Sequence, residues 1–316
     1  MNIRLIFNLF LLMIGGFVIT ITSIFIGKQA YFWLPPQAAA ESHLIDDLFS
    51  FLVTIGAFIF LGVTAVILYS VLFHRANNYD FSDGPHIEGN ITLEVIWTAI
   101  PIMLVLWIAS YSYEVYEQMG IQGPSHLLHL HNPIHIQAAF AEATETPAAT
   151  EIEIETENEP IELEKINVIA KQWAWVFQYP ETGISSTELH LPSDRRVHLA
   201  LQSEDVLHGF YIPAFRLKQD IVPGKTIDFE FTPIRPGKYS LTDSQYSGTY
   251  FATMQADVVV ETPEEYHTWL ETAATQTPSP AKNQAATEYA QNHNEKIQTG
   301  WETVKPAAPP IVNFSG

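Results

Sequence analysis

Three long apolar runs constrain this chain more than any other feature of its sequence. They are Leu5–Ile26, Leu48–Phe73 and Val95–Tyr113, and none contains a charged residue. Each is long enough to cross a hydrocarbon core of about 30 Å at a rise of about 1.5 Å per residue. The sequence therefore predicts three membrane-spanning helices, within residues 1–30, 44–74 and 92–116.

The first run is also compatible with a signal peptide. The apolar region of a signal peptide is shorter, about 7–15 residues, and this length difference favours an uncleaved span or anchor. Ala38, Ala39 and Ala40 nevertheless supply small residues of the kind found at cleavage sites. Arg4 and Arg75 would both be cytoplasmic if the N-terminus lies inside, in keeping with the positive-inside rule. That orientation places the chain after the third span on the outer face.

The charge of the chain is segregated from its apolar part. The formal net charge is −20, although the mean hydropathy is slightly positive at +0.07. Apolar spans joined to an acidic soluble part account for both values, and the acidity argues against a nucleic-acid partner. The chain contains no cysteine, which excludes disulfides and thiolate metal sites.

Residues 117–165 have the composition of a spacer. Four histidines are followed by glutamates that alternate with small or apolar residues. The histidines are His126, His129, His131 and His135. Histidine-rich tracts can bind metal, so a membrane-tethered metal-binding protein is one alternative function. A polar linker is favoured, because no carboxylate or cysteine is placed to complete a structural site.

Short β patterns begin at residue 166 and continue to residue 262. β-Branched and aromatic residues cluster or alternate, as in 167–170, 174–177, 197–201, 226–231 and 256–260. Turn signals such as Pro223-Gly224 separate these runs, and the pattern is typical of a sandwich or barrel. Residues 263–316 form a C-terminal tail, with a short helix expected at 263–270 and a mobile segment from Thr275.

Three segments, in the same order, resemble subunit II of cytochrome c oxidase. They are 86–101, which includes Leu-Glu-Val-Ile-Trp-Thr; 172–180, Gln-Trp-Ala-Trp-Val-Phe-Gln-Tyr-Pro; and 203–254, which includes Asp-Val-Leu-His. The resemblance implies a membrane α-helical hairpin, here with an extra N-terminal span, followed by an all-β, cupredoxin-like Greek-key domain.

The third segment departs from the family at the residues that bind copper. In the family, a histidine after Asp-Val-Leu and a later Cys-x-Glu-x-Cys-x-x-x-His-x-x-Met hold two copper ions. The matching positions here are His208, Asp243, Gln245, Ser247, Phe251 and Met254. Only the first histidine and the methionine remain, and bridging thiolates are what hold copper in such sites. We therefore expect no metal on this chain, and we expect Phe251 and Tyr246 to fill the vacated volume.

The altered loop resembles that of bacterial quinol oxidases, while Leu207–Asp220 resembles the copper-bearing type. With the extra span, the chain looks most similar to subunit II of the alternative terminal oxidases of cyanobacteria. The resemblance implies a subunit without catalytic residues, in a complex that reduces oxygen with haem and copper held in subunit I. Subunits I and III would be its partners and a membrane quinol the donor, in a plasma or thylakoid-type membrane. A cytochrome c oxidase with a non-standard electron entry is the alternative.

Three further residues are candidates for function. Glu94 begins the third span, and the resemblance implies a carboxylate at the mouth of a proton channel into subunit I. The alternative is a glutamate favoured by the dipole at a helix N-terminus. Trp173 and Trp175 match the aromatic patch that receives electrons from cytochrome c in copper-bearing relatives. Without copper, we expect them to serve in packing.

Overall fold

The computed structural model describes residues 3–74, 89–119, 121–124, 163–293 and 304–316. The chain forms two compact units, a helical unit of residues 1–36 and 41–119 and a β unit of residues 37–40 and 120–316. The four linker histidines lie outside the described residues, so their predicted role stays a prediction.

The helical unit consists of three long helices and one short helical turn. They are α1 (Ile3–Gln29), η1 (Ala30–Trp33), α2 (Ser42–Phe73) and α3 (Ile91–Gln118). All three long helices have the length and apolar composition needed to cross a membrane. Their large apolar side chains are mostly exposed in the isolated chain, as a lipid-facing or subunit-facing surface requires. The prediction of three apolar helices of spanning length is confirmed.

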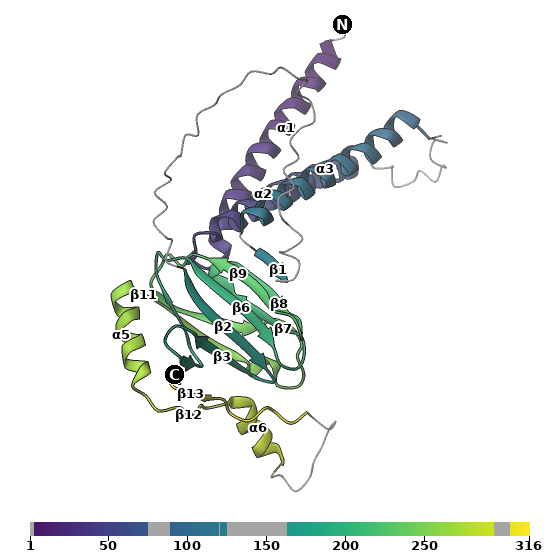
Figure 1. Ribbon diagram of the computed structural model, residues 1–316. Coiled ribbons are helices and arrows are strands. Elements are labelled where there is room, and N and C mark those ends of the chain that lie inside the picture. Colours follow the sequence, from purple (N-terminus) through teal and green to yellow (C-terminus); the bar gives the residue numbers. More distant parts are fainter. Residues whose placement is uncertain (1–2, 75–88, 120, 125–162, 294–303) are drawn as a thin grey trace, which may run out of the picture. The chain divides into compact units, whose positions relative to one another are not determined.

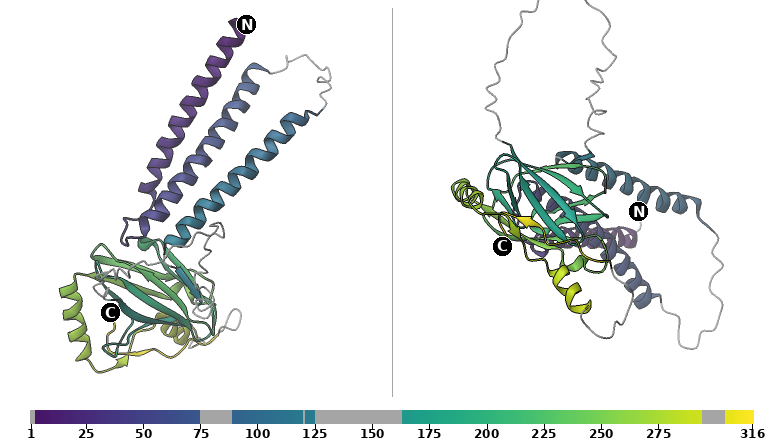
Figure 2. Two further views of the ribbon diagram at one scale, coloured as in Figure 1. Left: turned by 45° about the horizontal axis from the view of Figure 1, so that its top comes forward. Right: turned by 60° about the horizontal axis from the view of Figure 1, so that its bottom comes forward.

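Figure 2 shows the three long helices of this unit, and side-chain contacts join α1 to α2 and α2 to α3. The Ser50 hydroxyl of α2 donates to the carbonyl oxygen of Gly27 in α1 at 2.9 Å. Phe51 of α2 packs edge-on against Trp107 and Tyr111 of α3, at centroid distances of 5.0 and 5.1 Å. Such edge-to-face pairs stabilise packing beyond the area they bury.

The β unit is built from two large sheets and one small two-stranded sheet (Figure 1). The six-stranded sheet has the order β1 (Ile121–Pro124), β9 (Ile227–Phe231), β6 (Val197–Ser203), β2 (Glu164–Lys171), β3 (Ala174–Tyr179) and β4 (Ile184–Ser186). The five-stranded sheet has the order β5 (Leu189–Pro192), β11 (Gln255–Glu261), β10 (Gly237–Asp243), β7 (His208–Ile212) and β8 (Leu217–Ile221). The pairs β2–β6 and β5–β11 are parallel and the others are antiparallel. This arrangement is the predicted all-β fold.

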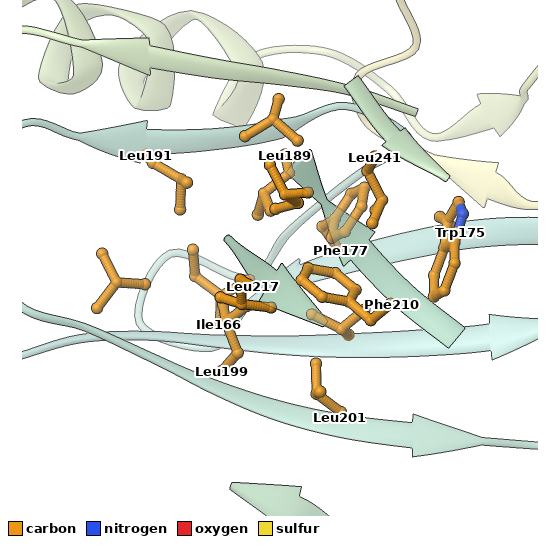
Figure 3. Close-up of a cluster of buried hydrophobic side chains, with 14 of the residues drawn as sticks. Ile166, Trp175, Phe177, Leu189, Leu191, Leu199, Leu201, Phe210, Leu217 and Leu241 are labelled. Carbon is orange, nitrogen blue, oxygen red and sulfur yellow. The ribbon is translucent and has the colours of Figure 1, made fainter. Parts of the chain in front are cut away.

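The core of the β unit lies between the two sheets. Buried residues alternate along β2, β6 and β9, as expected for strands with one face inward. Figure 3 shows the inward side chains meeting: Ile166, Phe177 and Leu199 from one sheet, and Phe210, Leu217 and Leu241 from the other. Each of these six residues is at most 1 % exposed. Burial of apolar area at about 25 cal/mol per Å² is the main stabilising contribution.

Residues 37–40 precede α2 yet belong to the β unit. The Ala38 amide donates to the carbonyl oxygen of Ala214 at 3.0 Å, and Ala40 donates to Thr232 at 2.8 Å. Ala38 and Ala39 are at most 1 % exposed. The small residues that suggested a cleavage site are therefore packed against the β sheets, where a larger side chain would not fit without displacement.

The C-terminal region departs from its prediction. The expected helix is present as α5 (Pro263–Ala274), with Thr262 and Glu265 forming a capping box. The expectation of a mobile segment from Thr275 is wrong for the described part. It forms β12 (Ser279–Pro280), α6 (Gln284–His293) and β13 (Ile311–Val312), with β12 and β13 paired. Ala281, Ala285 and Val312 are buried, because sparse small apolar residues in this polar segment find places on the β unit.

Candidate functional site

The candidate site lies where the loop between β10 and β11 meets the start of β7. Asp243 ends β10, and it pairs with Phe210 of β7. The loop continues through η3 (Phe251–Thr253) to Met254, and β11 begins at the next residue. Because β7 and β10 are neighbours in the sheet, His208 and Asp243 are brought together across 35 positions of sequence.

His208 is held between two carboxylates. Its Nδ1 lies 2.8 Å from Oδ2 of Asp243, and its Nε2 lies 2.9 Å from Oδ1 of Asp205. The side chains of His208 and Asp243 are fully buried, whereas that of Asp205 is 29 % exposed. Both ring nitrogens can donate at once only when the imidazole is protonated, so the geometry favours an imidazolium paired with two carboxylates.

Asp243 is the centre of this hydrogen-bond network. Its Oδ2 also accepts from the Ser247 hydroxyl at 2.7 Å, while Oδ1 accepts from the amides of Gly209 at 2.7 Å and Gln245 at 3.0 Å. Burial opposes a charged carboxylate, but the hydrogen bonds from His208, Ser247 and the two amides outweigh it and lower the pKa of Asp243. Three positions that match the copper-binding motif, His208, Asp243 and Ser247, are therefore joined in one network.

The pKa values of His208 and Asp205 also shift in the direction that favours the charged form of each group. Burial works against the imidazolium of His208, but hydrogen bonds and attraction from Asp205 and Asp243 outweigh it and raise the pKa of His208. For Asp205, burial is likewise outweighed by the hydrogen bonds from His208 and the amides of Gln172 and Val206, which lower the pKa of its carboxyl. Each of the three shifts therefore favours the charged form of its group.

Gln245 points away from this network. Its Nε2 donates to Oδ2 of Asp220 on β8 at 2.9 Å. The loop is thereby tied to a second strand of the same sheet. Neither Asp205 nor Asp220 was predicted as part of the site. The spacing of three residues between Asp205 and His208 is a local signal that could have identified the first, whereas the second depends on strand pairing.

Trp173 and Trp175 hold the loop from the opposite sheet. The Trp173 indole donates to the carbonyl oxygen of Ser247 at 3.2 Å, and the Trp175 indole donates to that of Met254 at 3.2 Å. Both side chains are 2 % exposed. Trp175 also lies edge-on to His208, with the ring centroids 6.2 Å apart. The two indoles therefore connect the two sheets through the two ends of the loop.

Gly248 is the point of closest approach between the loop and Trp173. Its φ is +119°, a conformation that only glycine adopts without strain. A Cβ at this position would lie 2.7 Å from Cζ2 of Trp173. The loop thus needs glycine here for its backbone conformation and for the space beside the indole.

The two aromatic residues expected to fill the vacated volume occupy different environments. Phe251 is partly buried against the core and lies edge-on to Tyr246 at 5.3 Å. Tyr246 is 76 % exposed, so the expectation that it fills the interior is wrong. Met254 is 1 % exposed. The side chain beside Nδ1 of His208 is that of Asp243, which the Ser247 hydroxyl contacts in turn.

Glu94 belongs to the helical unit. It lies in the first turn of α3, after Asn90, whose side chain accepts from the Leu93 amide at 3.2 Å. A carboxylate in this turn interacts favourably with the helix dipole. Its predicted role at a proton channel is tested by none of these contacts.

A second buried histidine lies in β5 of the same unit. His190 Nδ1 is 3.0 Å from Oε2 of Glu261, and Nε2 is 3.3 Å from Oε2 of Glu188. The ring stacks on Trp269 of α5, with centroids 3.9 Å apart and planes 7° from parallel. This His190 cluster was not predicted, since its four residues are dispersed along the chain without a motif.

The fold defines a class of protein with apolar helices of membrane-spanning length followed by an all-β domain of two packed sheets. Residues 27–115 match the family described as "Cytochrome C oxidase subunit II, transmembrane domain", and residues 184–262 match "Cytochrome C oxidase subunit II, periplasmic domain". The chain is 36 % identical to cytochrome c oxidase subunit 2 of Synechocystis sp. over 86 % of its own length and 84 % of the relative.

Two further proteins are similar to the chain at lower identity. Quinol oxidase subunit 2 of Bacillus subtilis is 25 % identical, covering 78 % of this chain and 67 % of the relative. The crystal structure of the periplasmic domain of subunit II of the cytochrome oxidase of Bradyrhizobium japonicum is 25 % identical, with a TM-score of 0.33, covering 34 % of this chain and 91 % of that one. The chain belongs to the cytochrome c oxidase subunit II family. It is therefore a membrane-spanning subunit of a haem-copper terminal oxidase, with a C-terminal domain of the periplasmic type.

Proposed function

We propose that this chain is a subunit II that lacks the binuclear copper site and serves an oxidase that takes electrons from a membrane quinol. The observation that carries the proposal is the His208 network. A carboxylate and a hydroxyl stand at the two cysteine positions, and both are hydrogen-bonded within the fold, Asp243 to His208 at 2.8 Å and Ser247 to Asp243 at 2.7 Å.

The chemistry of the donor set does not fit two bridged copper ions. Copper in such sites is held by soft thiolates, and the chain has no cysteine. Both ring nitrogens of His208 already face carboxylates, and Phe251 offers no ligand atom. Met254 keeps a thioether, which alone is a weak ligand. An internal imidazolium supplies positive charge beside Asp243, so the loop needs no metal to balance its buried carboxylate.

In this proposal the chain contributes structure to the complex. Its spans anchor it beside subunit I, which holds the haem and copper that reduce oxygen, and subunit III completes the assembly. The β domain shapes the outer surface of a plasma or thylakoid-type membrane complex. Glu94, at the exposed start of α3, is proposed to lie at the entrance of a proton path into subunit I. Replacing it with alanine is expected to slow turnover and leave the haem spectrum unchanged.

A second candidate follows from the names of the relatives. The Synechocystis protein, at 36 % identity, is a cytochrome c oxidase subunit, whereas the Bacillus quinol oxidase subunits are 24–25 % identical. A cytochrome c oxidase with an electron entry independent of copper on subunit II is therefore the competing function. Trp173 and Trp175 would be the residues to examine in that case.

Oxygen consumption by the purified complex distinguishes the two candidates. The rate is measured with a reduced quinol and, separately, with reduced cytochrome c. We expect activity with quinol alone, sensitive to a quinol-site inhibitor. Robust turnover with cytochrome c would contradict the proposed donor.

A further inference from the structure

The last described segment of the chain, residues 304–316, is named the C-terminal strap here. It extends the six-stranded sheet at β4, an edge strand. The amides of Asn313 and Phe314 donate to the carbonyl oxygen of Ser185 at 3.0 and 3.1 Å, and the amide of Thr187 donates to that of Phe314 at 3.2 Å. Ser186 and Phe314 form a parallel β-bridge. The strap therefore satisfies backbone groups that an open edge would leave unpaired.

Two side chains of the strap are recognised individually. Asn313 Oδ1 accepts from the amide and the hydroxyl of Ser185 at 3.0 and 3.1 Å, and its Nδ2 donates to the carbonyl oxygen of Gln276 at 3.1 Å. Phe314 lies edge-on to His190 at 5.4 Å and to Trp269 at 5.8 Å. The amide and the aromatic ring thus occupy adjacent sites of different chemistry.

The strap also contacts the β unit upstream of these two residues. Val312 is 1 % exposed and packs with Ala281 and Val176, beside the β12–β13 pairing (Figure 1). The Ala307 amide donates to the carbonyl oxygen of Gln172 at 2.6 Å. Ile311 is 67 % exposed. Pro310 and Val312 are buried on either side of the exposed Ile311, which is the alternation of a peptide bound along a sheet.

We propose that the β4 edge is a peptide-binding site of the strand-addition class, and that the C-terminal strap of the same chain is its resident ligand. Main-chain hydrogen bonds to the edge supply affinity in this mode, and pockets for particular side chains supply selectivity. The class of ligand is an extended segment with a buried aliphatic residue followed by asparagine and an aromatic residue. The inference concerns a different face from the His208 network, and it does not rest on the choice of electron donor.

The test uses the purified complex with residues 304–316 deleted and a fluorescently labelled peptide of that sequence. Anisotropy is expected to show saturable binding to the deletion variant, and binding at least about tenfold weaker to the full-length complex, whose site is occupied. A Phe314→Ala peptide is expected to bind about tenfold more weakly than the parent peptide, because it loses a partly buried ring. An Ile311→Ala peptide is the matched control and is expected to bind like the parent. Absence of binding to a folded deletion variant would overturn the proposal.

In a second experiment the strap remains part of the chain while the complex folds and is separated from it afterwards. A protease site is inserted after residue 298 of the full-length chain, the purified complex is cut, and the cut strap is followed through gel filtration. Retention of the parent strap and loss of a Phe314→Ala strap support the proposal, and equal behaviour of the two contradicts it. Concentration-dependent association of full-length complexes that the deletion abolishes would contradict the assignment of the strap to its own chain.

Discussion

His208 and His190 are both buried in the β unit with a carboxylate beside each ring nitrogen, but their partners differ in kind. His208 is paired with Asp243, whose side chain is fully buried and fixed by two backbone amides. His190 is paired with Glu188 and Glu261, which are 14 % and 19 % exposed, and it stacks on Trp269. His208 thus has one fully buried partner, Asp243, and one partner in contact with water, Asp205, whereas both partners of His190 remain partly in water.

The difference shows two uses of one residue type. At the His208 network, charge pairing inside the fold fixes the path of the chain between β10 and β11. At the other site, ring stacking attaches α5 and the C-terminal strap to the sheets, and the carboxylates stay accessible to solvent. The comparison predicts that loss of a carboxylate lowers stability strongly at the His208 network and weakly at the His190 cluster.

The largest expected loss of stability comes from removing Asp243, and the matched change at the other site removes Glu261. Asp243→Ala leaves His208 with one partly exposed carboxylate and leaves two backbone amides without an acceptor. The substitution is therefore expected to lower the unfolding free energy of the β unit by about 3–5 kcal/mol. Glu261→Ala is expected to cost about 1–2 kcal/mol. Denaturant midpoints from tryptophan fluorescence of the purified complex measure both. Equal losses of unfolding free energy in the two variants would contradict the predicted difference between the two sites.

Gly248→Ala tests how tightly the loop is held against Trp173. The positive φ and the 2.7 Å distance between the added Cβ and the Trp173 ring predict a loss of unfolding free energy of about 1–3 kcal/mol. Gly183→Ala is the control, since it has a φ of +71° but nothing within 4 Å of the added Cβ. The control is expected to lose less. A Gly248 variant no less stable than the control would indicate that the loop moves away from the indole.

The pH dependence of stability sharpens the role of charge at His208. A raised pKa in the folded state means that the stabilisation is fully present below the unfolded value of about 6.5 and is lost as pH rises through the folded value. The lowered pKa values of Asp205 and Asp243 give stabilisation that is present above about 3.8 and lost as pH falls. The stability difference between the parent and His208→Gln is expected to shrink on raising the pH above about 6.5. A difference that grows over this range would contradict a charged imidazole.

The smallest expected effects concern the two aromatic residues of the loop. Phe251→Ala is expected to cost about 1–2 kcal/mol, less than a fully buried phenylalanine, because its ring is only partly buried. Tyr246→Ala, at a side chain 76 % exposed, is expected to change stability by no more than about 0.5 kcal/mol. Thermal melting of the two variants beside the parent measures both. A melt of Phe251→Ala identical to the parent would show that Phe251 supports nothing in the loop.

The fold followed from the sequence because its signals are long or periodic. The three apolar helices and the strand alternation of β2, β6 and β9 are properties of contiguous residues. The motif also located His208 and Asp243. It did not reveal that Asp243 lies beside the imidazole, since that depends on the pairing of β7 with β10. The contact with Asp205 is local, at a spacing of three residues, and was not used. The packed C-terminal segment escaped prediction because its apolar residues, among them Ala281, Val312 and Phe314, follow no helical or strand period, and only tertiary contacts give them a place.

The central claim is that a hydrogen-bond network replaces two bridged copper ions, and electron paramagnetic resonance of the purified, copper-reconstituted complex tests it most directly. A variant with Asp243→Cys, Gln245→Glu, Ser247→Cys and Phe251→His restores the family's ligand set and serves as the control. We predict no binuclear copper signal from subunit II of the parent complex and its appearance in the restored variant. A binuclear copper signal from the parent complex would contradict the account.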